Sequence, residues 1–242
     1  MEAPANIDIA SVVAAIGALG LASFALVDAT KALRKGGVSN SGFLFIERAV
    51  QQLLPEEALG GSTADSNKQR TLLDILHANW IGGLPLADQK AIARSLIKLR
   101  LSPDTADQFA KAAAVNKEVL ENVARKMTDG RDLNASEANV LGRFDLALAA
   151  ILDEGYQRAD QRYRNRTRMY ASIVSMVLAV LGGWAVSGPE GAGAAAASVY
   201  FGSKQMWIAF FCGLLATPLA PISKDLASAL QSGVKLAQTL KR

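Results

Sequence analysis

Residues 158–184 read RADQRYRNRTRMYASIVSMVLAVLGGW, a strongly basic stretch followed directly by an uncharged apolar one. Within the basic stretch, four arginines occupy alternate positions: Arg162, Arg164, Arg166 and Arg168. On an α-helix, neighbouring members of this series lie about 200° apart, so their charge surrounds the helix and leaves no apolar face for a protein core. We call these four residues the arginine collar. A basic ring beside an apolar helix is typical of the point where a helix enters a membrane, and we expect the collar to contact anionic lipid.

The apolar stretch over 169–186 contains no ionisable side chain except the phenol of Tyr170. As a helix it is about 27 Å long, which is close to the thickness of the hydrocarbon layer. Two further uncharged runs have similar length, 9–27 and 206–222. The sequence therefore predicts three transmembrane helices, although an alanine-rich core helix of a soluble bundle is an alternative for the first run. Two prolines near the inner end of the third run are expected to kink or unwind it.

The composition limits the chemistry that the chain can perform. The 242 residues are 50% hydrophobic with a formal net charge of +4, and they include one cysteine, Cys212, and one histidine, His77. A single cysteine excludes an intramolecular disulfide, and a single histidine excludes a multi-histidine metal site within one chain. We predict no catalytic residue, no metal and no cofactor. The positive charge lies beside the apolar runs, which favours lipid headgroups and predicts no nucleic-acid partner.

The order of apolar and charged segments predicts an all-α fold. Period-two alternation, the mark of strands, is missing from the sequence pattern. We predict five segments: an N-terminal transmembrane helix within 1–35, a cytoplasmic helical domain over 36–135, a stalk helix with the collar over 136–168, a transmembrane hairpin over 169–222, and an amphipathic tail over 223–242. The stalk is expected to continue into the second transmembrane helix, and Gly155 is the point at which it would kink. The tail is expected to lie on the membrane surface or on the stalk.

Several local signals divide the predicted helical domain. Residues 56–68 are rich in Gly, Ser, Asp and Asn and are expected to form a loop. Asn116 is a predicted N-cap, and Ser136 is expected to cap the stalk helix. We expect Trp80 to be buried and to close the domain, and His77 to have a structural role.

Each apolar run carries small residues at four-residue spacing, which lets helix backbones approach closely in lipid. We predict that these rows form helix-packing or oligomer interfaces. The rows are Ala10, Ala14, Ala18 and Ala22 in the first run, Ala171, Ser175, Ala179 and Gly183 in the second, and Ala209, Gly213 and Thr217 in the third. Packing within one chain and self-association both remain open.

Charged residues at the ends of the apolar runs predict the orientation of the chain. Lysine and arginine follow the first and third runs and precede the second, and cytoplasmic flanks carry such an excess. The N-terminus is therefore expected outside, with residues 28–168 and the C-terminus in the cytoplasm. Residues 1–8 contain no lysine or arginine, so no cleavable signal peptide is predicted. The composition suggests a bacterial inner (plasma) membrane.

The predicted transmembrane helices contain no Asp, Glu, Lys, Arg or His, which argues against a pump or an ion-coupled transporter. Our leading hypothesis is a non-enzymatic membrane anchor or scaffold. It would form a homo-oligomer and present its helical domain to a cytoplasmic protein partner. The alternative is a subunit of an oligomeric channel or pore, lined by hydroxyl side chains such as Ser172, Ser175 and Thr217.

Overall fold

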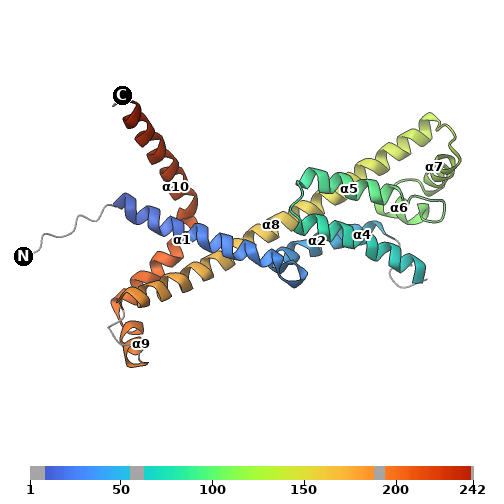
Figure 1. The fold of residues 1–242 in the computed structure, drawn as a ribbon. Coiled ribbons are helices and arrows are strands. Elements are labelled where there is room, and N and C mark those ends of the chain that lie inside the picture. Colours follow the sequence, from blue (N-terminus) through green and yellow to red (C-terminus); the bar gives the residue numbers. More distant parts are fainter. Residues whose placement is uncertain (1–8, 55–62, 188–193, 241–242) are drawn as a thin grey trace, which may run out of the picture. The chain divides into compact units, whose positions relative to one another are not determined.

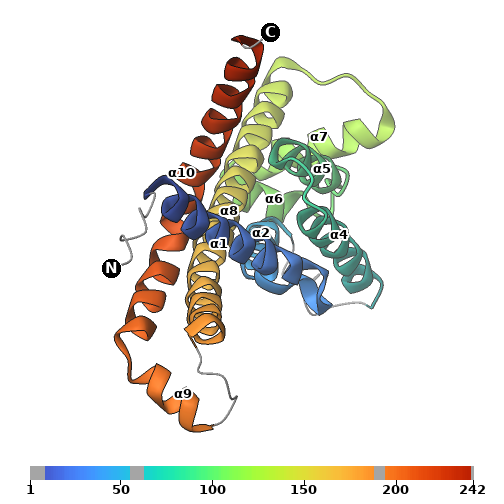
Figure 2. The same ribbon diagram turned by 60° about the vertical axis from the view of Figure 1, so that its left-hand side comes forward.

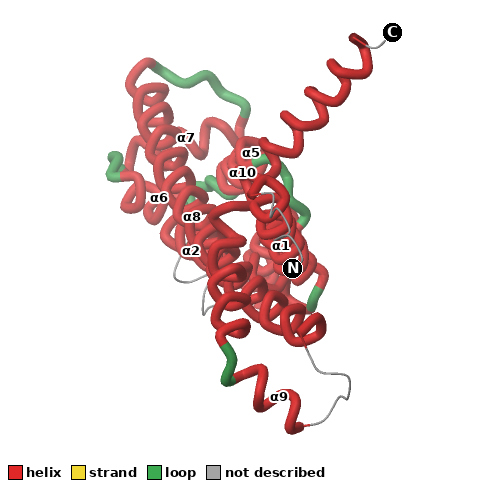
Figure 3. The backbone as a smooth tube through the Cα atoms, turned by 90° about the vertical axis from the view of Figure 1, so that its left-hand side faces the viewer, coloured by secondary structure: helices red, strands yellow, loops and turns green. Residues whose placement is uncertain are grey.

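The computed structural model describes residues 9–54, 63–187 and 194–240, and this part of the chain consists of helices and connecting loops (Figure 3). The chain divides into two compact units. The helical unit is Arg34–Tyr163, and the apolar unit combines Met1–Leu33 with Arg164–Arg242. One long helix, α8 (Ala135–Ser187), contributes its first part to the helical unit and its second part to the apolar unit (Figure 1).

The helical unit is built from short amphipathic helices and the first part of α8. Its elements are η2 (Arg34–Ser39), α2 (Asn40–Leu53), α4 (Thr63–Ile81), α5 (Leu86–Lys98), α6 (Ala106–Ala113) and α7 (Lys117–Asp129). The predicted loop over 56–68 differs from the structure, because residues from Thr63 onwards are helical. Residues 56–62 of the predicted loop lie outside the described part of the chain.

The predicted division between a helical domain ending at 135 and a separate stalk beginning at 136 also differs from the structure. Five apolar residues of α8 lie in the hydrophobic core of the helical unit: Phe144, Leu148, Leu152, Tyr156 and Ala159. Each is at most 1% exposed. Their spacing of three and four residues places them on one helix face, and the shorter helices cover that face. Residues 135–163 therefore form the core helix of this unit.

Gly155 marks a close approach between two helices of the helical unit, and α8 runs through this position as an unbroken helix. A Cβ atom at this position would lie 2.5 Å from the Cβ of Ala49 and 3.3 Å from the carbonyl oxygen of Phe45, both on α2. The glycine that suggested a kink in the sequence therefore serves helix packing.

Trp80 is buried at the end of α4, as the sequence predicted, with 7% of its surface exposed. Its indole Nε1 donates a hydrogen bond of 2.9 Å to the carbonyl oxygen of Ser39, and its ring meets that of Tyr163 edge to face. His77 is one turn away on α4, and its Nε2 lies 3.2 Å from Oδ1 of Asn40. These contacts tie α4 to the beginning of α2, so both aromatic side chains hold the unit together.

Capping residues explain where α7 and α8 begin. The side chain of Asn116 accepts a hydrogen bond from the backbone N–H of Val119, which confirms the predicted N-cap. The predicted cap at Ser136 is wrong. The N-cap position is taken by Asn134, whose Oδ1 accepts a bond of 2.9 Å from the N–H of Glu137, while Oε2 of Glu137 accepts one of 2.8 Å from the N–H of Asn134. This reciprocal arrangement is a capping box.

Glu137 also accepts a hydrogen bond of 2.8 Å from the ammonium of Lys126, on α7. Together with the bond from the backbone N–H of Asn134, this contact lowers the pKa of the Glu137 carboxyl group. The carboxylate therefore links the end of α7 to the first turn of α8.

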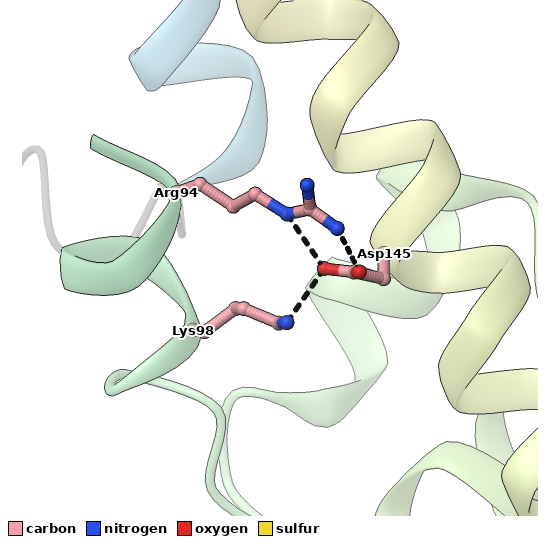
Figure 4. Close-up of polar contacts among 3 residues, drawn as sticks. All are labelled: Arg94, Lys98 and Asp145. Carbon is pink, nitrogen blue, oxygen red and sulfur yellow. Dashed lines mark hydrogen bonds and ion pairs between the residues drawn. The ribbon is translucent and has the colours of Figure 1, made fainter. Parts of the chain in front are cut away.

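Charged residues join α5 to α8 along the outside of the helical unit (Figure 4). The guanidinium of Arg94 binds both carboxylate oxygens of Asp145, with 2.9 Å between Nε and Oδ1, and the ammonium of Lys98 lies 2.7 Å from Oδ1. One helical turn before Arg94, Lys90 lies 2.7 Å from Asp153. Asp153 lies on α8, so this pair also joins α5 to α8.

We expect Asp145→Asn to destabilise the helical unit by about 1 kcal/mol at neutral pH, because a two-point contact with arginine is stronger than an ordinary surface ion pair. Hydrogen bonds from Arg94 lower the pKa of Asp145 in the folded chain. Its contribution is therefore complete above the unfolded pKa of about 3.9 and is lost as the pH falls through the lower folded value.

Urea unfolding of the full chain in mild detergent at pH 7 and in stronger acid measures this effect. Asp132→Asn is the matched control, because Asp132 is exposed and forms no ion pair within the described residues. Equal losses in the two variants at pH 7 would show that the α5–α8 contact is not stabilising.

Within its described residues, the apolar unit contains three long helices and two short ones. They are α1 (Ile9–Ala29), η1 (Thr30–Ala32), the second part of α8, α9 (Ala194–Phe201) and α10 (Lys204–Leu240). Three helices are long and apolar enough to cross a membrane, over Ser11–Ala32, Ala135–Val186 and Lys204–Ile222. These include most of each predicted transmembrane segment.

Two prolines, Pro218 and Pro221, lie inside α10 without ending it. Of the two predicted effects, the structure has the kink and not the unwinding: α10 stays helical through both prolines, and Figure 1 shows it changing direction between its orange and dark red parts. Such a bend is the usual effect of proline within a helix. Residues 223–240 continue α10, but the side chains beyond Asp225 lie outside the described part. The surface on which the tail lies therefore stays a prediction.

Candidate helix-packing and lipid-contact site

The second part of α8 packs closely on α10, and Figure 2 shows the two helices side by side. Oγ of Ser175 lies 2.7 Å from the carbonyl oxygen of Gly213 and 2.9 Å from that of Ser172 in its own helix. A Cβ atom on Gly213 would lie 2.6 Å from Cα of Met176. Only glycine fits at this crossing, since the atom in the way belongs to the backbone.

About one turn further along α10 and two turns along α8, small residues again face each other. A Cβ atom on Gly183 would lie 3.1 Å from the Cβ of Ala209 and would clash with the hydroxyl of Tyr200. That hydroxyl donates a bond of 3.1 Å to the carbonyl oxygen of Val180, so α9 is fastened to α8. The structure thus brings together members of two predicted rows within one chain.

The remaining members of these two rows differ in burial. Ala171 and Ser175 are completely buried, and Thr217 is 8% exposed. Ala179 is half-buried. The hydroxyl oxygen of Thr217 is buried and has no hydrogen-bond partner among the described residues.

The first helix, α1, packs on α10 through residues that the sequence analysis did not select. A Cβ atom on Gly20 would overlap the backbone carbonyl group of Ala216, and it would lie 3.1 Å from the Cβ of Ala220. Gly17 is also buried on α1, as are Ser23 and Val27 on the following turns. Two glycines three residues apart were the signal that marked this face, because glycine permits the closest approach of two helices.

The predicted row on α1 lies away from this buried face. Ala14 is half-buried, Ala18 and Ala22 are exposed, and the side chain of Ala10 lies outside the described part. Counting 100° per residue, Ala18 is on the side of the helix roughly opposite Gly20. Self-association through this row stays a prediction.

Large apolar side chains of the apolar unit point outwards. In the most apolar part of its three long helices, only 22%, 11% and 22% of the residues are buried. Side chains between 45% and 63% exposed include Leu26, Ile173, Val177, Leu181, Ile208 and Leu215. Such a surface, distributed over three helices, is unfavourable in water.

The arginine collar is mostly exposed. Arg162, Arg164 and Arg168 are exposed, and Arg166 is half-buried. Among the residues that the structure describes, Arg162, Arg166 and Arg168 form no ion pair with the protein. In the helical unit, by contrast, the charges of Lys90, Arg94, Lys98, Lys111, Lys117, Arg125, Lys126, Arg131 and Arg158 all pair with carboxylates.

Within the described ranges, no group of three or more His, Cys, Asp or Glu side chains could hold a metal ion. Comparison with protein-family models, with curated proteins and with solved structures found no match.

Proposed function

We propose that this chain is a non-enzymatic membrane anchor or scaffold. Its three apolar helices would span a bacterial inner (plasma) membrane, and the chain would oligomerise there. The helical unit would be presented to a cytoplasmic protein assembly. The proposal depends mainly on the outward-facing apolar side chains of α1, α8 and α10.

Transfer from water into hydrocarbon stabilises large apolar side chains by about 1.5–3 kcal/mol each when they are fully covered. A lipid environment would cover the exposed side chains of all three helices at once. The internal contacts fit this environment too, because glycine and alanine let backbones touch and because the buried hydroxyls of Ser23 and Ser175 bond to backbone carbonyls.

Charge supports the proposed orientation, with the N-terminus outside. Lys31 pairs with Asp28 at 2.6 Å, so Arg34 and Lys35 provide the net positive charge after α1. The collar precedes the apolar part of α8, and further basic residues follow the apolar part of α10. At the opposite ends of the helices, Trp207 is 56% exposed, as expected for an aromatic residue at a membrane interface.

The helical unit supports the scaffold role because it has its own hydrophobic core. Helix caps, buried aromatic residues and ion pairs stabilise this unit, and a stably folded unit can bind another protein. The pore alternative has less support. Ser175 and Thr217, two of the three hydroxyl residues that would line a pore between subunits, are buried within a single chain.

Cysteine labelling tests membrane insertion and orientation. In a Cys212→Ala background, we expect Ser198→Cys to react with a membrane-impermeant maleimide in intact cells. Ser95→Cys should react only after lysis, because the proposed topology places α9 outside and α5 in the cytoplasm. Both positions are exposed, so they are matched for reactivity. Labelling of Ser95→Cys in intact cells would contradict the proposed orientation. Release of the chain from membranes by carbonate would contradict membrane insertion.

Native mass measurement in mild detergent distinguishes a scaffold from a pore. A scaffold should be recovered as an oligomer together with soluble companions, and it should give no conductance in planar bilayers. Conductance by the pure oligomer would favour the pore.

A further inference from the structure

We propose that Arg166 and Arg168 bind the phosphate group of acidic phospholipids directly. Arg162 and Arg164 would attract the same lipids from outside the headgroup layer. The inference rests on the proposed function, since it requires residues 169–186 to lie in hydrocarbon. It divides the arginine collar into two pairs of equal charge and different role.

The first argument is depth along the helix. Met169 is the first residue of the apolar stretch, and each helical residue advances about 1.5 Å. For a helix along the bilayer normal, Arg168 and Arg166 then begin about 1.5 and 4.5 Å outside the hydrocarbon, whereas Arg164 and Arg162 begin about 7.5 and 10.5 Å outside it. Each headgroup layer is roughly 5–7 Å thick, so only the first pair starts within it.

The direction of the side chains increases this difference. In an α-helix, the bond from Cα to Cβ tilts towards the N-terminus of the helix. Since α8 enters the proposed membrane in the N-to-C direction, all four arginines lean towards the cytoplasm. Arg168 and Arg166 therefore extend into the headgroup layer, and Arg164 and Arg162 extend away from it.

The second argument is the absence of competition for the guanidinium groups. Neither Arg166 nor Arg168 forms an ion pair with the described part of the chain, although nine cations of the helical unit do. Their N–H donors are therefore available for an external anion. A guanidinium offers two parallel donors to a phosphate, which is the geometry that arginine favours.

The third argument identifies the anion as a lipid phosphate. Met169 and Tyr170, the residues that follow the collar, are 51% and 40% exposed, and Ile173 is 45% exposed one turn further on. A ligand that covers both the arginines and these apolar side chains needs a phosphate next to hydrocarbon chains. An acidic phospholipid such as phosphatidylglycerol has this chemistry, whereas a nucleic acid has no hydrocarbon to offer.

The test compares two double variants of the full chain that remove the same charge. Wild type, Arg166→Gln/Arg168→Gln and Arg162→Gln/Arg164→Gln are incorporated into nanodiscs containing equal amounts of phosphatidylglycerol and phosphatidylcholine. Native mass spectrometry then counts the lipids retained by each chain. We expect wild type to prefer phosphatidylglycerol. In Arg166→Gln/Arg168→Gln this preference should fall about 30-fold, because each arginine near the surface contributes a factor of about 5. In Arg162→Gln/Arg164→Gln it should fall less than about 3-fold, because attraction weakens with distance from the surface.

Three results would overturn the assignment: no lipid preference in wild type, equal losses in the two variants, or displacement of the lipid by a short RNA or by inorganic phosphate at the same concentration. Incorporation into nanodiscs of pure phosphatidylcholine is measured first. Failure at that step would contradict membrane insertion itself, so it is distinguishable from failure of the lipid assignment.

Discussion

Gly20→Leu is expected to separate α1 from α10 and to destabilise the apolar unit by about 3 kcal/mol or more. A Cβ atom at this position would overlap the carbonyl group of Ala216, and Ala220 closes the same space at 3.1 Å. Overpacking costs about 1–3 kcal/mol when side chains can adjust. Here the obstacle is backbone, so one helix must move away from the other and the contacts along both are weakened.

Hydrogen exchange of the full chain in nanodiscs measures this separation, because amides of α1 should lose protection. Gly182→Leu on α8 is the matched control, since a Cβ atom there would meet nothing within 4 Å. The control adds the same side chain to a helix of the same unit. Unchanged protection of α1 in Gly20→Leu would show that α1 and α10 are not packed through this glycine.

Gly155→Leu is expected to have a comparable effect on the helical unit, with a loss of about 3 kcal/mol or more. The new side chain would begin 2.5 Å from the Cβ of Ala49, beside a core in which Leu152, one turn earlier, and the adjacent Tyr156 are each 1% exposed. No side-chain rotation relieves a clash between two Cβ atoms. The α2–α8 contact must open instead.

Gly142→Leu provides the comparison within the same helix, because a Cβ atom on Gly142 would meet nothing within 4 Å. There the exchange should stabilise the helix by up to about 1 kcal/mol, since leucine is a better helix former than glycine. Urea unfolding of both full-length variants measures whether each change raises or lowers the free energy of unfolding. A stabilising Gly155→Leu would mean that α8 stands apart from α2, as a stalk would.

Local signals predicted several elements correctly because they act over a few residues. The side chain of Asn116 reaches an N–H three residues away, so its capping role follows from sequence order. The long helix through Gly155 was predicted from the lack of a strong breaker, and the helix is continuous. Three helices apolar enough to span a membrane follow directly from uncharged runs of sufficient length.

Interactions between distant residues account for most differences. The four-residue spacing of Phe144, Leu148 and Leu152 predicts an apolar helix face, but it does not predict which helices cover that face. The ion pairs of Asp145 connect residues about fifty positions apart, and no local pattern relates them. On α1, the predicted interface was the row of four alanines, whereas the contact with α10 is made at Gly20.

The sequence by itself determined that the chain is helical, where its apolar runs lie, and that a ring of arginines borders one of them. These properties depend on the chemistry of side chains that are close together in the sequence, so they can be predicted before the fold is known. Only the tertiary structure decided that residues 135–163 form a core helix, and which small residues bring backbones together. Both features depend on which faces of the helices meet. Close packing favours the faces that carry glycine, because the absence of a side chain there allows two backbones to touch.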